Sequence, residues 1–141
     1  MNHYIHTVQY YETDKMGITH HSNYIRWMEE ARIDFLKQLG WDYDRLEAEG
    51  IISPVIGIDC KYLQSTTFAD KVSIMVVVEE FKGVRLKLRY EMTKEDGQPA
   101  ASGHSEHCFL NKEGRPIRLK KDFPGFFDAL TELIERPANE A

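Results

Sequence analysis

The densest group of polar, reactive side chains in the sequence lies in residues 10–24. It contains the carboxylates Glu12 and Asp14 and the adjacent histidines His20 and His21. A carboxylate can act on an acyl carbonyl as a general base or as a nucleophile. A histidine can donate a hydrogen bond to a carbonyl oxygen or position a water molecule. This stretch is therefore the first candidate for a site, with Asp14 as its leading residue.

Each of these residues also has an ordinary structural alternative. A loop aspartate often accepts hydrogen bonds from the amides of its own turn, which applies to Asp14 and equally to Glu12. A single loop histidine is more often solvated or structural than catalytic. His20 and His21, however, directly precede a predicted helix. The first-turn amides of that helix carry partial positive charge and would face the same point as the histidines.

The flanking sequence predicts a strand before this loop and a long helix after it. Residues 3–11 are rich in aromatic and β-branched side chains, which favours a strand. From Ser22 to Leu39, apolar residues recur every three or four positions, which predicts an amphipathic helix. Ser22 or Asn23 is the expected N-cap, and Gly40 fits the position after the last turn. The loop is thus expected to adjoin a helix N-terminus, where negative charge is stabilised.

The predicted helix has one apolar and one charged side. The apolar side consists of Tyr24, Trp27, Met28, Ala31, Phe35 and Leu39. The charged side consists of Arg26, Glu29, Glu30, Arg32, Asp34 and Lys37. The apolar side is expected to face the core.

The rest of the sequence predicts mainly β-structure. A short helix or turn is expected within 41–50. Strands are predicted at 51–63, 71–81, 84–93 and 100–111, with a short one near 117–119 and a tight hairpin at Lys82-Gly83. Residues 123–136 favour a second helix and 137–141 a frayed tail. The pattern predicts one α+β domain over residues 1–136, in which a curved antiparallel sheet of five to six strands wraps one long helix.

Composition excludes several classes of function. The chain has 141 residues, a formal net charge of −5 and a pI of about 5.7, which argues against a general nucleic-acid or anionic-membrane binder. No apolar run approaches the length of a membrane span. The N-terminal residues lack the basic and apolar segments of a secretory signal, and Cys60 and Cys108 show no metal-ligand spacing. A reduced, cytoplasmic protein is therefore expected.

Two further groups of residues have weaker functional interpretations. His104 and His107 are three positions apart on a predicted strand, which puts them on opposite faces and disfavours a shared metal. A basic group follows the predicted hairpin and comprises Lys82, Arg85, Lys87 and Arg89. A solvated strand face is its default role, and contact with a phosphorylated ligand is the alternative.

Three segments resemble a known family. They are YETDKMG at 11–17, HSNY at 21–24 and RWMEEAR at 26–32. Together they resemble the hotdog-fold acyl-CoA thioesterases, and within them the 4-hydroxybenzoyl-CoA thioesterase and YbgC-like branch. The resemblance implies a sheet wrapped around the helix from Ser22. It also implies homodimers, often paired into homotetramers, with active sites at subunit interfaces.

The resemblance also assigns roles to residues. It makes Asp14 the catalytic carboxylate and selects His21, rather than His20, as the catalytic histidine. Substrate contacts are expected within the same motif and, by hairpin position, from the basic group; these residues are Gly17, Ser22, Asn23, Tyr24, Lys82 and Arg85. The sequence departs from the family pattern at Glu12, where many relatives have Asp, and at Lys15-Met16, which replace small residues.

The sequence thus predicts hydrolysis of an acyl-CoA, or of an acyl carrier protein thioester, to a free acid and a thiol. No metal or redox cofactor is expected, because coenzyme A is part of the substrate. Two alternatives are a hotdog dehydratase or hydratase acting on 3-hydroxyacyl thioesters and a non-catalytic acyl-CoA-binding module. Uncovered sheet edges favour a homo-oligomer.

Overall fold

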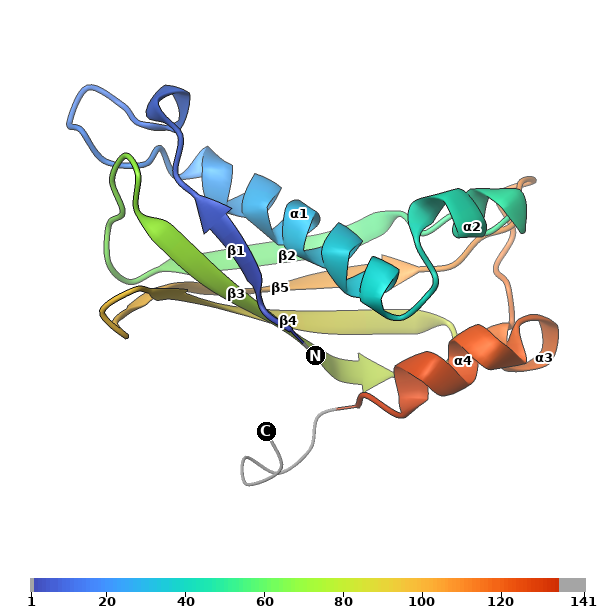
Figure 1. The fold of residues 1–141 in the computed structure, drawn as a ribbon. Coiled ribbons are helices and arrows are strands. Elements are labelled where there is room, and N and C mark those ends of the chain that lie inside the picture. The colour runs from blue at the N-terminus through green and yellow to red at the C-terminus, as the bar shows by residue number, and fades with distance from the viewer. Residues whose placement is uncertain (1, 135–141) are drawn as a thin grey trace.

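Five antiparallel strands form one curved sheet in a computed structural model that describes residues 2–134 (Figure 1). The strands are β1 (Tyr4–Thr7), β2 (Val55–Tyr62), β3 (Lys71–Phe81), β4 (Arg85–Lys94) and β5 (Pro99–Cys108). Their order is β1-β3-β4-β5-β2, so three consecutive strands form a meander and β1 and β2 are the edges. The predicted α+β class is confirmed, and the curved antiparallel sheet has five strands where five to six were predicted.

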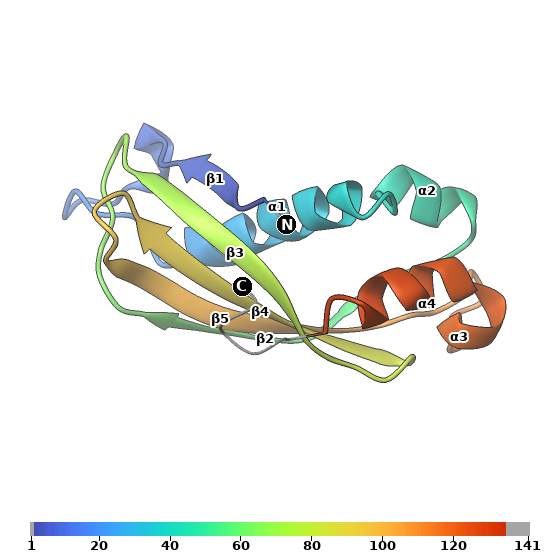
Figure 2. The ribbon, with the colours of Figure 1, turned by 60° about the horizontal axis from the view of Figure 1, so that its bottom comes forward.

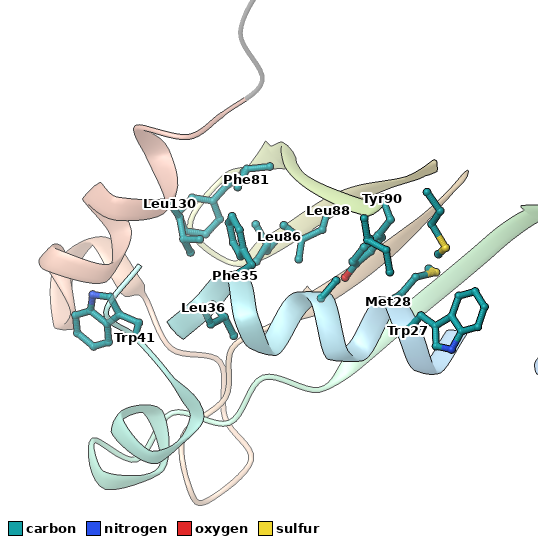
Figure 3. Packing of buried hydrophobic residues seen from close by; sticks show 14 of the residues in the cluster. Trp27, Met28, Phe35, Leu36, Trp41, Phe81, Leu86, Leu88, Tyr90 and Leu130 are labelled. Atoms are coloured by element: carbon teal, nitrogen blue, oxygen red, sulfur yellow. The ribbon is translucent and has the colours of Figure 1, made fainter. Parts of the chain in front are cut away.

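The long helix α1 (Ser22–Gln38) lies along one face of this sheet (Figure 2). Its predicted apolar side is buried apart from Leu39, which is partly buried. Trp27 and Met28 are fully buried, and Phe35 packs in the half of the core that also contains Leu130 (Figure 3). The helix ends as the sequence predicts. Gly40 has a φ of +83° and donates to the Lys37 carbonyl at 3.0 Å, the positive-φ conformation that glycine adopts readily.

The start of α1 differs from the sequence prediction. Neither Ser22 nor Asn23 is the N-cap: the helix starts at Ser22, and His21 precedes it with no capping side-chain bond. The Ser22 hydroxyl instead pairs with Nδ1 of His20 at 2.8 Å. Asn23 is turned inward, where its Nδ2 donates to the Glu12 carbonyl at 2.9 Å. Both expected capping side chains are therefore engaged by the preceding loop.

Arg32 is the exception to the predicted charged side of α1. Its side chain is only 8 % exposed, and its Nε donates to the Tyr43 hydroxyl at 3.4 Å. Tyr43 is the first residue of α2 (Tyr43–Ala48). Arg32 also interacts with the buried Tyr90 of β4 and His107 of β5, so its side chain points toward the sheet rather than to solvent. The sequence pattern assigns Arg32 to the charged side, because a charged side chain within the buried side of a helix is not expected from apolar periodicity.

The remaining differences from the predicted elements are local. The first strand stops at Thr7, and a short 3₁₀ helix, η1 (Tyr10–Glu12), replaces its expected end. The strand expected near 117–119 is wrong, because α3 (Leu119–Asp122) begins there. The terminal helix, α4 (Pro124–Thr131), is shorter than predicted. The end of that prediction at 135–136 and the predicted tail, 137–141, lie outside the described residues.

The two short C-terminal helices close the end of the core that is distant from the N-terminal loop (Figure 1). Phe126 of α4 stacks on Trp41 with ring centroids 4.9 Å apart and contacts Phe109 edge-on at 5.6 Å. Within residues 2–134, no helix has both the length and the apolar character needed to cross a bilayer.

Candidate active site

The polar loop between η1 and α1 folds back on itself as a narrow ribbon. Thr13 and Thr19 form an antiparallel bridge, and the Asp14 amide donates to the Ile18 carbonyl at 2.9 Å. The tip is closed by the Gly17 amide, which donates to the Asp14 carbonyl at 2.9 Å. Gly17 has a φ of +79°, a conformation that L side chains rarely adopt. Asp14 thus lies where the ribbon turns.

The Asp14 carboxylate is half-buried and has two different oxygens. Oδ1 accepts a hydrogen bond from the Met16 amide at 2.8 Å, as in an Asx turn. Oδ2 has no hydrogen-bond donor among residues 2–134. The structural alternative for Asp14 therefore accounts for one oxygen, and the other is available to a water molecule or a substrate.

Glu12 has a different environment, although it lies only two residues earlier. Its side chain is 4 % exposed and accepts from the Gln9 amide, the His6 Nε2 and the Trp27 Nε1. Burial would by itself raise the pKa of Glu12, but the bonds from Trp27, Gln9 and His6 outweigh burial and lower it. All hydrogen bonds of the Glu12 carboxylate are made inside the fold, so Glu12 has a structural role. The structure thus distinguishes Glu12 from Asp14, which keeps one oxygen free of protein donors within residues 2–134.

The two histidines also differ. His20 is exposed and pairs with the Ser22 hydroxyl, as described above. His21 is exposed, its ring lies 4.2 Å from that of His20, and Tyr62 meets it edge-on at 6.1 Å. The Tyr62 hydroxyl donates to the His21 carbonyl at 3.1 Å, so the edge strand β2 holds the main chain at this point. No protein group occupies the side-chain nitrogens of His21 within the described residues.

The amides at the start of α1 are only partly available. Asn23 donates to the His20 carbonyl at 3.0 Å, and Tyr24 donates to the His21 carbonyl at 3.3 Å. The amide of His21 itself has no acceptor in residues 2–134. The free donors at this helix start are therefore the amide and the ring of one residue, His21.

The substrate contacts predicted for Asn23 and Tyr24 stay predictions, and both side chains are anchored in the protein interior. The Tyr24 hydroxyl pairs with Thr66 Oγ1 at 3.0 Å, and Thr66 Oγ1 pairs with Thr19 Oγ1 at 2.6 Å. Thr67 also donates to the Gly17 carbonyl at 2.8 Å. The segment before β3 thus holds the loop in place by hydrogen bonds from Thr66 and Thr67. Thr66 and Thr67 were not predictable as part of the site, because only the fold brings them to the loop.

Lys82 and Arg85 are not brought to Asp14 within one chain. They lie in the β3–β4 hairpin, at the opposite end of the sheet from the loop in both views (Figures 1 and 2). β3 alone spans about 35 Å between these ends at roughly 3.3 Å per residue. The hairpin carries a shallow depression of about 200 Å³, in which two acidic residues accompany the basic ones. It is lined by Glu80, Lys82, Arg85, Leu86, Lys87 and Glu106.

The two histidines of β5 do face opposite sides of the sheet. His107 is 1 % exposed and its Nε2 pairs with Ser105 Oγ at 2.7 Å, whereas His104 pairs with Asp59 on the outer face at 3.0 Å. Among residues 2–134, no group of three or more His, Cys, Asp or Glu side chains is arranged to hold a metal ion. Both cysteines are free thiols.

Comparison with known proteins decides the family. A profile of the Thioesterase-like superfamily matches residues 8–132. The chain belongs to this superfamily. It is a thioester hydrolase of the hotdog fold, as the motif around Asp14 predicted.

Three similar proteins illustrate the relationship. The crystal structure of a DHNA-CoA thioesterase from Staphylococcus aureus superposes with a TM-score of 0.87 at 35 % identity, covering 93 % of this chain and 89 % of that one. The structure of BH1999 gentisyl-coenzyme A thioesterase gives a TM-score of 0.78 at 29 % identity, covering 86 % and 98 %. A Bacillus subtilis (strain 168) protein, YneP, provisionally named an acyl-CoA thioesterase, is 32 % identical over 86 % of this chain and 89 % of its own.

Proposed function

We propose that this thioesterase hydrolyses acyl-CoA substrates and that Asp14 supplies the reactive carboxylate. The observation that carries the proposal is the difference in hydrogen bonding between the two Asp14 carboxylate oxygens. Oδ1 is held by the Met16 amide, so the group is oriented, while Oδ2 has no donor within residues 2–134. An oriented carboxylate with one free oxygen can deprotonate water or attack a thioester carbonyl directly.

His21 is the proposed partner that stabilises negative charge on the thioester oxygen. Its main-chain amide and its ring nitrogens have no hydrogen-bond partner within residues 2–134 and lie at the start of α1. The partial positive charge of a helix N-terminus adds to the effect of such donors. The products are a free acid and the thiol of coenzyme A, and the reaction as proposed needs no metal or redox group.

The test is thiol release from a panel of acyl-CoA esters. The panel includes hydroxyaryl-CoA esters, because the two solved relatives above are named for such substrates, and aliphatic esters of increasing length. Asp14→Asn keeps the shape of the side chain and the bond from the Met16 amide. We expect it to lower kcat by about 100-fold or more, since a positioned general base typically contributes that much.

Asp96→Asn is the matched control for this variant. Asp96 forms the same Asx turn in the β4–β5 hairpin, where its Oδ1 accepts from the Gln98 amide at 2.9 Å, and a positive-φ glycine follows it as well. It should retain wild-type kcat. Undiminished turnover in Asp14→Asn would exclude the proposed role, and saturable binding of every ester without thiol release would favour a binding module.

We also propose that the chain works as a homo-oligomer built on the outer edge of β2. Several apolar side chains on or beside this edge strand are 44–48 % exposed, and they are Ile52, Val55, Ile56, Ile58, Tyr62 and Leu63. An unpaired, apolar edge strand tends to pair with another chain. A second copy would cover it and would bring another chain next to Tyr62 and His21. A dimer, or a tetramer of two such dimers, in the cytoplasm is the proposed working form.

Light scattering after gel filtration tests this assembly. The chain mass is 16.5 kDa, and wild type should elute with the mass of two or four chains. Ile56→Lys should reduce that mass, because a charge on an edge strand opposes pairing. Ile5→Lys, on the other edge strand β1, should leave it unchanged. If Ile5→Lys dissociates the assembly and Ile56→Lys does not, the proposed interface is wrong.

A further inference from the structure

Glu12 is a buried carboxylate that the proposed chemistry does not use. Its Oε1 accepts from the Gln9 amide and from His6 Nε2, both at 2.8 Å, and its Oε2 accepts from Trp27 Nε1 at 2.7 Å. A buried charge is tolerated only when donors compensate for its lost hydration. Three donors on two oxygens leave the Glu12 side chain a single orientation.

The three donors come from three different parts of the fold. His6 lies on β1, Gln9 precedes η1, and Trp27 is on the second turn of α1. The His6 ring also packs on Trp27 with centroids 4.5 Å apart. Glu12 is therefore the point at which the edge strand, the short 3₁₀ helix and the long helix are joined by polar contacts.

The contacts continue beyond Glu12 to the outer side of α1. Nδ1 of His6 pairs with Glu30 Oε1 at 2.9 Å, and the same oxygen accepts from the Tyr4 hydroxyl at 2.7 Å. Both ring nitrogens of His6 thus face carboxylate oxygens. His6 is fixed between Glu12 and Glu30 and cannot rotate without losing one of them.

The main-chain carbonyl of Glu12 links this fixed residue to the candidate site by hydrogen bonds. Its carbonyl accepts from the His20 amide at 2.8 Å and from Asn23 Nδ2 at 2.9 Å. The ribbon that follows ends at Asp14 on one strand and returns to His20 on the other. Glu12 therefore touches both halves of the site, the half that carries the carboxylate and the half that carries the histidines.

We infer that Glu12 is a positioning residue, which fixes the relative placement of Asp14 and the His20–His21 segment. The inference rests on the proposed role of Asp14. A displacement of about 1 Å in a catalytic group can cost roughly 100-fold in rate, so an anchor two residues from that group acts on turnover. The neighbouring side chains Tyr10, Tyr11 and Met16 are 76–81 % exposed and provide little packing of their own.

Glu12→Gln tests the inference with almost no change of shape. The side-chain amide nitrogen of the glutamine cannot accept a hydrogen bond. Depending on its orientation, the variant loses either the bond from Trp27 Nε1 or the two bonds from His6 Nε2 and the Gln9 amide. We expect kcat to fall by about tenfold or more, while KM stays within about threefold, because the substrate contacts themselves are not removed. Folding is followed by near-UV circular dichroism and thermal melting.

Two companion variants separate positioning from loss of stability. Tyr90→Phe deletes a buried hydrogen bond of 2.7 Å to Ser105, elsewhere in the core, and should keep wild-type kcat below its melting temperature. His6→Phe keeps a ring against Trp27 but removes the donor to Glu12. It should lower kcat in the same direction as Glu12→Gln, and it replaces that variant as the test if Glu12→Gln does not fold.

The outcomes distinguish this inference from the proposed function. If Asp14→Asn is inactive while Glu12→Gln and His6→Phe turn over like wild type, the positioning role is wrong and the role of Asp14 stands. If Tyr90→Phe loses as much kcat as Glu12→Gln, stability explains the loss and the positioning role is again wrong. Full activity of Asp14→Asn would instead remove the proposed function on which the inference rests.

Discussion

Met28 of α1 packs directly on Gly103 of β5. A Cβ added at Gly103 would lie 3.1 Å from the Met28 Cε and 2.4 Å from the Asp59 carbonyl oxygen of β2. Helix α1 and strand β2 thus both approach β5 closely at a position that has no side chain. This contact sets the distance between α1 and the sheet at the half of the helix that leads into the candidate site.

Gly103→Ala should therefore destabilise the protein by about 1–3 kcal/mol, the usual cost of overpacking a core. Chemical denaturation measures the change. Gly125→Ala is the control, because a Cβ at this position in α4 would make only an ordinary 3.6 Å contact with Trp41, and alanine favours helix. Equal stability of Gly103→Ala and wild type would mean that the sheet shifts without cost.

Gly17→Ala should impair turnover through the backbone at the tip of the loop. The φ of +79° is strained for alanine by roughly 1 kcal/mol, and relief of that strain would move the neighbouring Asp14. Gly114→Ala is a matched control, since Gly114 has a φ of +82° and equally open surroundings in a turn outside the site. Both variants should lose similar stability, and only Gly17→Ala should lose kcat. A parallel loss of kcat in both would contradict this prediction.

His107 should make the protein less stable in mild acid. Burial, aided by the charge of Arg32, lowers the pKa of His107 from 6.5 to about 4. The unfolded state therefore binds a proton between these values that the folded state does not, so stability falls as the pH is lowered through this window. The full contribution is roughly 3 kcal/mol. His107→Gln, measured by denaturation from pH 7 to pH 4, should flatten the slope, whereas substitution of the exposed His3 should not.

Arg85 should affect substrate binding rather than chemistry. It lies at the far end of the sheet from Asp14, so any contact with the phosphates of coenzyme A must involve the hairpin of a second copy. Arg85→Ala should then raise KM about two- to fivefold at unchanged kcat, the range of an exposed charge pair, and added salt should diminish the difference. Lys112→Ala, in a turn after β5, provides the comparison. An unchanged KM would show that neither Arg85 nor the hairpin contributes to substrate binding.

Features of the fold that depend on local sequence were predictable. The repeat of apolar residues from Tyr24 to Phe35 determines which side of α1 is buried, and Gly40 marks its end. β3 has the predicted bounds, which lie on either side of an apolar run at 74–78. The motif around Asp14 and His21 indicated the superfamily before any geometry was known.

Features that depend on contacts between distant segments were not predictable. The buried position of Glu12 could not be predicted, because its donors on His6 and Trp27 are supplied by elements on either side of the loop. Arg32 has the character of a surface residue, and only the fold places Tyr43 and the buried Tyr90 against it. Asn23 resembles a helix cap, and only the folded loop offers its side chain the carbonyl of Glu12. The end of the sheet to which the basic hairpin belongs likewise follows from topology alone.

The dependence of the loop on Thr66 and Thr67 has a consequence for how the protein folds. Thr19 and Thr66 are separated by 47 residues and Gly17 and Thr67 by 50, whereas β3, β4 and β5 pair through short hairpins. Contacts across long chain segments form late, because closing such segments costs entropy before any contact compensates for it. We expect the meander to assemble first and the Asp14 ribbon last. During refolding, native-like sheet structure should therefore precede the recovery of enzymatic turnover.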